Sequence, residues 1–133
     1  MRALSVLSLA LAAGLAATLP AAAQAPADGA HLFAQNCSAC HQLTGKGIPG
    51  AFPALAGDVL VQGPAAVPSK VVLNGRGGMP AFKGELTNQQ IASVLTYVRS
   101  SWGNHAPPVT PAVVSQARGG GDLGKASGAL QAH

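Results

Sequence analysis

Large side chains and charges are scarce in this 133-residue sequence. Aromatic residues make up 4% of it and charged residues 9%, while glycine (17) and proline (10) are abundant. A small domain with so few aromatic side chains usually needs a metal, a disulfide or a cofactor to fold stably. The net charge is +4, but lysine and arginine nowhere form a run. The dense basic patch that nucleic-acid binding requires is therefore absent.

Charge is scarcest at the N-terminus, where Arg2 is the only charged residue in a long apolar stretch that ends in small residues. This pattern predicts a secretory signal at residues 1–23, with cleavage near residue 23 or 25. We expect export to a bacterial periplasm, with membrane contact only through a partner or an uncleaved signal anchor. No later stretch is apolar and long enough to span a bilayer.

The clearest helix signal lies at residues 87–103. Thr87 and Gln90 have the spacing of a capping box, and Gly103 is a helix stop. The apolar residues between them recur at the spacing of one helical face: Ile91, Val94, Leu95, Val98 and Trp102. A shorter helix is expected at about 28–36, capped by Asp28, and another near 69–73, beginning at or just before Pro68.

No segment alternates polar and apolar residues as a half-buried strand does, so the sequence predicts an all-α fold with long loops. We expect one domain at residues 24–103. A C-terminal extension, 104–133, should contain a short helix at about 111–118, because Thr110 and Pro111 form a good N-cap and first-turn pair. The glycine-rich residues after it read as a flexible tail.

Both cysteines of the chain lie in the stretch CSACH, residues 37–41. A redox dithiol is disfavoured, because such pairs begin a helix in a βαβ setting and no strand is predicted here. Structural zinc requires four ligands. The stretch offers three, and the histidines left to complete the set are His31, His105 and His133. The last two lie in the predicted extension, which makes zinc a weak alternative.

The third interpretation is covalent haem, because C-x-x-C-H is the attachment signature of c-type haem. The thiols of Cys37 and Cys40 are spaced to reach the two vinyl groups on one porphyrin edge. The next residue, His41, then brings its imidazole to the iron. Export agrees with this interpretation, since attachment takes place outside the cytoplasm.

A second iron ligand is needed for an electron-transfer haem, and methionine is common in that role. Met79 is the only methionine besides the initiator, and it lies in the Gly/Pro-rich stretch NGRGGMPAFKGEL. Glycine lets the backbone approach the porphyrin closely, and Pro80 restricts the loop. If Met79 did not bind the iron, the protein would be a haem sensor or enzyme with an open distal site.

With these residues placed, residues 28–102 resemble the class I c-type cytochromes, especially small bacterial ones with one haem. Gly29, Phe33 and Cys37 match the N-terminal helix of that family, and Val94 and Tyr97 match the helix that crosses it. The stretches GAFPALAG and GGMPAF are similar to the loops on the two faces of the haem. Pro68 departs from the pattern, because relatives tend to continue a helix there.

The resemblance implies a cytochrome c fold, with few short helices and long loops around one covalently bound haem c. It implies that Cys37 and Cys40 form the thioethers and that His41 and Met79 bind the iron. It also implies that the Pro53 carbonyl accepts a hydrogen bond from His41 and that Leu55 packs on the haem. A site closed in this way transfers one electron and catalyses no reaction of its own.

The expected partners are redox proteins: a dehydrogenase, an oxidase or a reductase. The protein would carry electrons between a dehydrogenase or respiratory complex and a terminal acceptor, or would be the cytochrome subunit of such a complex. Exposed cations beside the haem could steer acidic partners: Lys46, Lys70, Arg76 and Lys83. Ordinary solubility charge explains these four equally well.

Apolar burial around a haem would also compensate for the thin core. The side chains expected to form its wall are Leu32, Phe33, Leu55, Val71, Val72, Ile91, Leu95 and Val98. Each Å² of apolar area removed from water stabilises a fold by about 25 cal/mol, and a macrocycle offers more such area than an aromatic side chain. We therefore expect the protein without haem to be largely unfolded.

Overall fold

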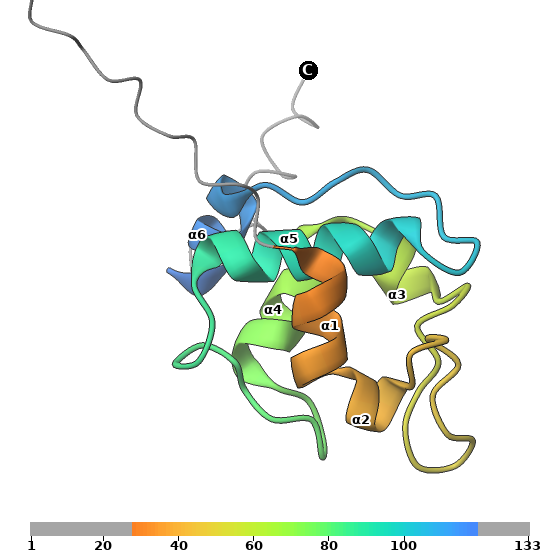
Figure 1. The fold of residues 1–133 in the computed structure, drawn as a ribbon. Helices are drawn as coiled ribbons and strands as arrows, with labels where there is room; N and C mark the ends of the chain where they lie inside the picture. The colour runs from red at the N-terminus through yellow and green to blue at the C-terminus, as the bar shows by residue number, and fades with distance from the viewer. Residues whose placement is uncertain (1–27, 120–133) are drawn as a thin grey trace, which may run out of the picture.

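The computed structural model describes residues 28–119 (Figure 1). The predicted signal at 1–23 and the predicted tail from residue 120 onward lie outside the described residues. The described part is all-α, as expected, and contains no β-strand. Its helices are α1 (Gly29–Asn36), α2 (Ser38–His41), α3 (Val59–Gln62), α4 (Ala66–Asn74), α5 (Asn88–Ser100) and α6 (Pro111–Arg118). None of these helices could cross a membrane.

Helix α1 begins where the sequence predicts, at an Asp28 cap. The carboxylate of Asp28 accepts the backbone N–H groups of Ala30 (3.0 Å) and His31 (3.3 Å), which would otherwise lack partners at the helix start. The chain then bends at Cys37, which ends α1 and precedes α2. The motif CSACH therefore forms a separate helical turn at the end of α1.

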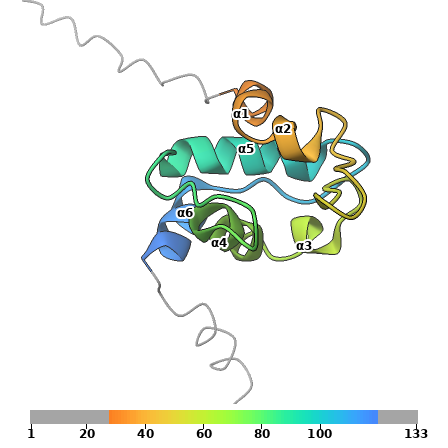
Figure 2. The same cartoon turned by 90° about the horizontal axis from the view of Figure 1, so that it is seen from below.

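Helix α1 crosses α5 at very close range, as the family resemblance implies (Figures 1 and 2). A Cβ atom added to Gly29 would overlap the carbonyl oxygen of Ser93 and crowd the Cβ of Tyr97. Only glycine fits at this crossing, because any side chain would force the two backbones apart. The crossing fixes the position of α2, and hence of CSACH, against the rest of the molecule.

Helix α5 has the predicted capping box. Gln90 N–H donates to Thr87 Oγ1 (3.2 Å), and Thr87 N–H donates to Gln90 Oε1 (2.9 Å). The end of the helix differs from the prediction, because α5 stops at Ser100 and Trp102 has a positive φ of 54°. Trp102 turns out of the helix to pack on Phe33, at a centroid distance of 5.0 Å, and on Tyr97, at 5.6 Å.

Helix α4 begins at Ala66, two residues before Pro68. Pro68 lies within the first turn, where helical N–H groups have no partner inside the helix, so the proline removes no helical bond. The helix ends at Asn74, as expected, and Gly75 follows with a φ of 73°. Helix α3 was not predicted. It starts where the Asp58 carboxylate accepts the Val61 N–H at 2.8 Å.

The chain after α5 turns back and runs along that helix to α6. Ala106 N–H donates to the Arg99 carbonyl (3.0 Å), and Val109 N–H donates to Thr96 Oγ1 (2.9 Å). Figure 2 shows α1 on one side of α5, with α4 and α6 on the other. The returning segment therefore packs on the helices, although the sequence analysis places a domain boundary at residue 103.

Two clusters of buried side chains flank α5. The α1 side contains Leu32, Phe33, Val61, Val94 and Val98. The α4 side contains Leu73, Ile91, Ala92, Leu95, Val109, Val114 and Ala117. The last three come from the returning segment. Residues 104–118 therefore add apolar side chains to a core that has few large ones, independently of any cofactor.

Candidate functional site

The imidazole of His41 is held from one side by the loop that follows it. Its Nδ1 lies 3.0 Å from the carbonyl oxygen of Pro53, and the residue is 8% exposed. A carbonyl oxygen can only accept a hydrogen bond, so Nδ1 carries a proton, and in the neutral ring Nε2 then keeps a free lone pair. The hydrogen bond expected from the resemblance is therefore present, and it prepares Nε2 to bind a metal.

The thiols of Cys37 and Cys40 are half-buried and are not joined in a disulfide. Burial, and to a lesser extent the neighbouring Cys40, raise the pKa of Cys37 to about 11. A redox dithiol needs a lowered thiol pKa, because the thiolate is the nucleophile. The environment of the Cys37 thiol therefore argues against the dithiol alternative.

Residues 42–58, here the proximal loop, fold back beneath His41 through two glycines. Gly45 (φ 66°) lies against the Trp102 indole, and a Cβ on Gly47 (φ 62°) would overlap the carbonyl oxygen of Phe52. The Leu55 N–H and the Ala56 N–H both donate to the Gly45 carbonyl, at 2.7 and 3.0 Å. These contacts bring Pro53 to His41.

The residue directly after His41 has an unusual backbone conformation. Gln42 has φ 62° and ψ 151°, a region that is almost confined to glycine. Strain of this kind persists only where the surroundings enforce it, and it often marks functional sites. Here it reverses the chain after His41, which lets the proximal loop return with the Pro53 carbonyl toward the ring.

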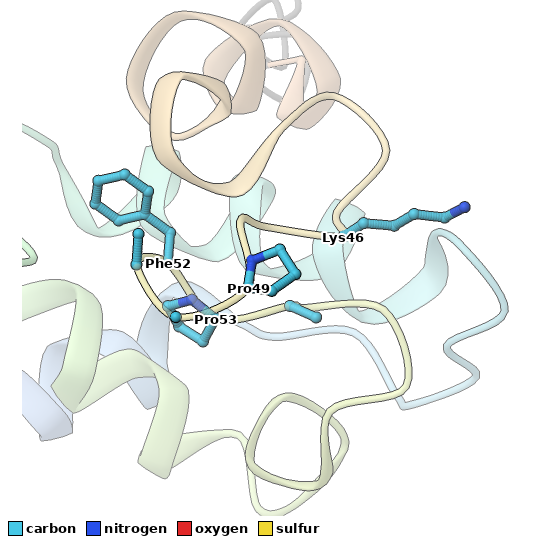
Figure 3. Close-up of a pocket in the computed structure, with 7 residues that line it drawn as sticks. Lys46, Pro49, Phe52 and Pro53 are labelled. Atoms are coloured by element: carbon cyan, nitrogen blue, oxygen red, sulfur yellow. The ribbon is translucent and has the colours of Figure 1, made fainter.

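The proximal loop leaves large apolar side chains in the open. Leu43 is 65% exposed, Ile48 39% and Phe52 37%. Phe52 lines an open hollow of about 320 Å³ together with Pro49 and Pro53. Figure 3 shows Phe52 on one side of these prolines and the Lys46 side chain directed away on the other. The hollow is therefore lined mostly by apolar side chains, with Lys46 as its one charged residue.

Residues 75–86, here the distal loop, carry Met79. A tight turn brings Arg76 and Met79 together, with Met79 N–H donating to the Arg76 carbonyl at 3.0 Å. Gly75 makes the turn possible, because a Cβ there would overlap the Met79 carbonyl oxygen. Met79 is half-buried. The distal loop and the proximal loop both lie at the lower end of the molecule in Figure 1, where α2 also lies.

The expected haem wall needs correction at two positions. Phe33 and Ile91 have no exposed surface, even with protein atoms alone. Protein side chains enclose them completely, so neither can face a cofactor and this part of the prediction is wrong. Leu55, Val71 and Val72 keep exposed surface, and Leu55 packs, like Cys37, against the cluster on the α1 side.

The zinc alternative finds no support in residues 28–119. Within that range, no three His, Cys, Asp or Glu side chains are grouped so that they could hold a metal ion. The four cations proposed for steering are all exposed, on the two loops and on α4: Lys46, Lys70, Arg76 and Lys83.

Three polar residues that sequence reasoning missed join the loops to the helices. Arg99 is buried and donates to the carbonyls of Val61, Gly63 and Pro107. Asn104 is also buried, and Arg118 bonds to the distal loop. The sequence shows Arg99 near the end of an apolar helix, but a positive charge is favourable there in any helix, so the position alone does not reveal these hydrogen bonds.

The residues at this site fit a covalently attached haem. The hydrogen bond to Pro53 orients His41 so that Nε2 can bind a metal. Two half-buried thiols lie on the adjoining turn, and exposed apolar side chains nearby could be covered by a porphyrin. Glycines 45, 47 and 75 hold the backbone in turns that side chains would block. Each feature matches what a porphyrin attached at its edge requires: a nitrogen ligand, two sulfur anchors and an apolar surface.

Comparison with known proteins agrees with this fit. Residues 24–98, more than half of the chain, match the family described as cytochrome C oxidase, cbb3-type, subunit III. Cytochrome c6 of Leptolyngbya boryana is 43% identical over 74 residues, which cover 54% of this chain and 87% of that protein. Cytochrome c-552 of Thermus thermophilus is 39% identical over 97 residues, covering 62% and 65%.

A larger relative extends the match. The cytochrome c subunit of the quinone alcohol dehydrogenase of Gluconacetobacter polyoxogenes is 33% identical over 131 residues, which cover 89% of this chain and 26% of that subunit. The chain thus spans about a quarter of the length of that subunit. Taken with the site geometry, these matches show that the chain belongs to this family of c-type cytochromes, electron-transfer proteins that carry covalently attached haem c.

Proposed function

We propose that the protein is a periplasmic one-electron carrier whose haem iron is bound by His41 and Met79, with Cys37 and Cys40 as the thioether anchors. Bound haem c supplies an iron that alternates between Fe(III) and Fe(II). The observation that carries the proposal is the His41–Pro53 hydrogen bond, which leaves Nε2 as the one ring nitrogen able to bind iron.

Met79 is proposed as the distal ligand because it is the only methionine of the described residues and lies in the glycine-rich distal loop. Its thioether is a soft ligand that favours the reduced metal. With His41 and Met79 as its protein ligands, the iron would have no position open to a substrate. This closed arrangement separates an electron carrier from a haem sensor or an enzyme with an open distal site.

The test is the sulfur-to-iron(III) charge-transfer band in the far-red absorption of the oxidised protein. We expect the wild-type protein to show it and Met79→Leu, which keeps the side-chain volume, to lose it. In both proteins the haem should survive acid–acetone extraction, because the thioethers are untouched. If Met79→Leu keeps the band, Met79 is not the ligand; if the wild type lacks the band, the site is open.

We propose export through residues 1–23 as the route to the periplasm. The apolar stretch after Arg2 and the small residues that follow it support this route. The intact mass of the holoprotein from its native host should correspond to a start at Gln24 or Pro26. A mass that includes residues 1–23 would contradict cleavage and would favour a membrane anchor.

The proposed partners are redox proteins, and a dehydrogenase is the first candidate. Two relatives support this choice, since they are named as cytochrome subunits of an alcohol dehydrogenase and a fructose dehydrogenase. Exposed cations near the site, Lys46 and Lys83 among them, suit an acidic partner surface. A reduction rate that does not change with ionic strength would contradict such steering.

A second candidate is a permanent subunit of a dehydrogenase complex. The match to the alcohol dehydrogenase subunit covers 89% of this chain, a larger share than the matches to the small cytochromes cover. Fractionation of native cells separates the two candidates. A free carrier should elute as a small protein from the periplasmic fraction, whereas a subunit should co-purify with a dehydrogenase.

A further inference from the structure

The returning segment, residues 104–118, reaches both loops of the site from opposite ends of α5. Between its ends it is fixed to that helix by hydrogen bonds to Arg99 and Thr96. Val109, Val114 and Ala117 anchor it in the buried cluster on the α4 side. A segment held in this way is a rigid frame against which each loop can be positioned.

At its first end, Asn104 holds the proximal loop. Its side chain is fully buried and all of its hydrogen-bonding groups are used. Oδ1 accepts the Gly57 N–H at 2.8 Å, and Nδ2 donates to the carbonyls of Leu55 (3.0 Å) and Val98 (2.9 Å). One amide therefore joins the end of α5 to the loop that also carries Pro53.

At its other end, Arg118 holds the distal loop. Its guanidinium donates through Nη1 to the Lys83 carbonyl, through Nη2 to the Leu86 carbonyl (2.9 Å) and through Nε to Asn88 Oδ1 (2.7 Å). A planar, charged fork of donors suits three acceptors that must keep a fixed arrangement. Both carbonyls belong to the part of the distal loop that follows Met79.

The distal loop needs such an anchor because its first half is built from glycines. Gly75, Gly77 and Gly78 give it large conformational freedom once Met79 is released. The loop is also bonded to α4 through Gly75 N–H to the Val71 carbonyl (2.8 Å), Phe82 N–H to the Val72 carbonyl (2.9 Å) and Lys83 N–H to the Leu73 carbonyl (3.1 Å). Leu86, at its end, packs against both buried clusters. Without Arg118 the side of the loop toward α5 loses two of its hydrogen bonds.

We propose that Arg118 is a positioning residue for the distal ligand. By holding the carbonyls of Lys83 and Leu86, it keeps the distal loop in the conformation in which Met79 binds the iron, and so it lowers the rate and extent of ligand loss. This inference rests on the proposed role of Met79. It gives residues 104–118 a function at the site beyond filling the core.

The test is competition by imidazole, followed through the loss of the sulfur-to-iron(III) band in the oxidised holoprotein. Imidazole binds only molecules in which the methionine has left, so its apparent Kd falls in proportion as that fraction rises. For Arg118→Ala we expect the apparent Kd to fall about tenfold, the effect of losing hydrogen bonds to a charged donor. The apparent Kd of Arg118→Lys, which keeps the charge, should lie between those of the wild type and Arg118→Ala.

Two control variants separate positioning from general stability. Gln116→Ala alters an exposed residue of the same helix and should leave the apparent Kd unchanged. Asn104→Ala should lower Tm at least as much as Arg118→Ala, because it empties a buried polar position, yet it should change the Kd less. If Arg118→Ala and Asn104→Ala lose the same Tm and have the same apparent Kd for imidazole, the inference is overturned and Arg118 has only a structural role.

The remaining outcomes are also decisive. A wild-type band together with an unchanged Kd in Arg118→Ala overturns the positioning role and leaves the proposed function standing. A wild-type protein without the band overturns the assignment of Met79 and the positioning role with it. If Arg118→Ala fails to fold, Arg118→Lys and Asn104→Ala still provide the comparison.

Discussion

The proximal and distal loops serve the same site but are held in different ways. The proximal loop is fixed along its length: to His41 by the Gly47 N–H and the Pro53 carbonyl, and within itself at Gly45. The distal loop is fixed near its ends, where Arg118 and the end of α4 hold it. Within itself it is bonded at the turn from Arg76 to Met79 and near its end, where the N–H groups of Glu85 and Leu86 donate to the Phe82 carbonyl at 3.1 and 3.0 Å.

This difference corresponds to the two proposed ligands. A histidine directly after two covalent anchors would be presented in one orientation, and a loop bonded along its length keeps its ring from turning. A methionine on a loop held at its ends depends on those ends, because local opening requires the loss of few contacts. We therefore expect changes on the proximal side to affect folding, and changes on the distal side to affect ligation first.

The largest expected effect comes from removing the anchors on the proximal side. The double variant Cys37→Ala, Cys40→Ala should hold no covalent haem, and its circular dichroism should show most of the helical signal lost. The physical reason is that Leu43, Ile48 and Phe52 then stay exposed and the small core is insufficient.

The control for that experiment is Ser38→Ala, in the same turn. Its hydroxyl donates only to the Ala34 carbonyl, so haem attachment and helical signal should both persist. A native-like helical spectrum from the double cysteine variant would contradict the expectation that folding depends on the cofactor.

The second effect tests the dense packing of the proximal loop. Gly47→Ala adds a Cβ where the backbone has a positive φ and where the carbonyl of Phe52 leaves no room. We expect it to lower the free energy of unfolding by about 2–4 kcal/mol, the sum of a left-handed conformation and an overpacked contact. Denaturant titration of the holoprotein measures this.

Gly50→Ala is its matched control. Gly50 also has a positive φ, of 79°, but a Cβ there meets nothing within 4 Å. Only the conformational cost should remain, about 1–2 kcal/mol. Equal losses at the two positions would mean that the proximal loop is less tightly packed than its contacts indicate.

The smallest expected effect on folding, with the clearest effect on ligation, comes from the distal loop. Gly75 has φ 73° and ψ 173°, a conformation nearly exclusive to glycine, and a Cβ there would push on the Met79 carbonyl. Gly75→Ala should weaken or abolish the sulfur-to-iron(III) band while the haem stays attached and the helical signal is retained.

Gly77→Ala provides the comparison on the same loop. Gly77 has a φ of 58° and open space around it, so its substitution should keep most of the band. If Gly75→Ala unfolds the protein as readily as Gly47→Ala does, the two loops are equally coupled to the fold. The contrast between them would then have to be abandoned.

Much of the fold could be read from the sequence because its signals are local. The capping box at Thr87, the Asp28 cap and the start of a helix at Pro111 each depend on residues within one turn. The end of α5 was misjudged, because Trp102 satisfies the helical spacing but is drawn out of the helix by Phe33 and Tyr97. Long-range packing overrode local periodicity there.

The residues of the site also differ in whether the local sequence indicates their role. The five residues CSACH are enough to indicate haem attachment, and Met79 stands out because the chain has only two methionines. The roles of Asn104 and Arg118 could not be foreseen, since their partners lie at least 30 residues away for most of their bonds. Every residue has a backbone carbonyl, so the sequence does not show which residue will accept such a hydrogen bond.

The sequence by itself determined the helices, the attachment motif and the loop that carries the single usable methionine, because each is specified by neighbours along the chain. Only the tertiary structure decided how the loop after His41 returns to its ring, and where residues 104–118 go. Their return along α5 depends on apolar surfaces of α4 and α5 that exist only after those helices have packed. A segment that reads as an extension thus becomes part of the core.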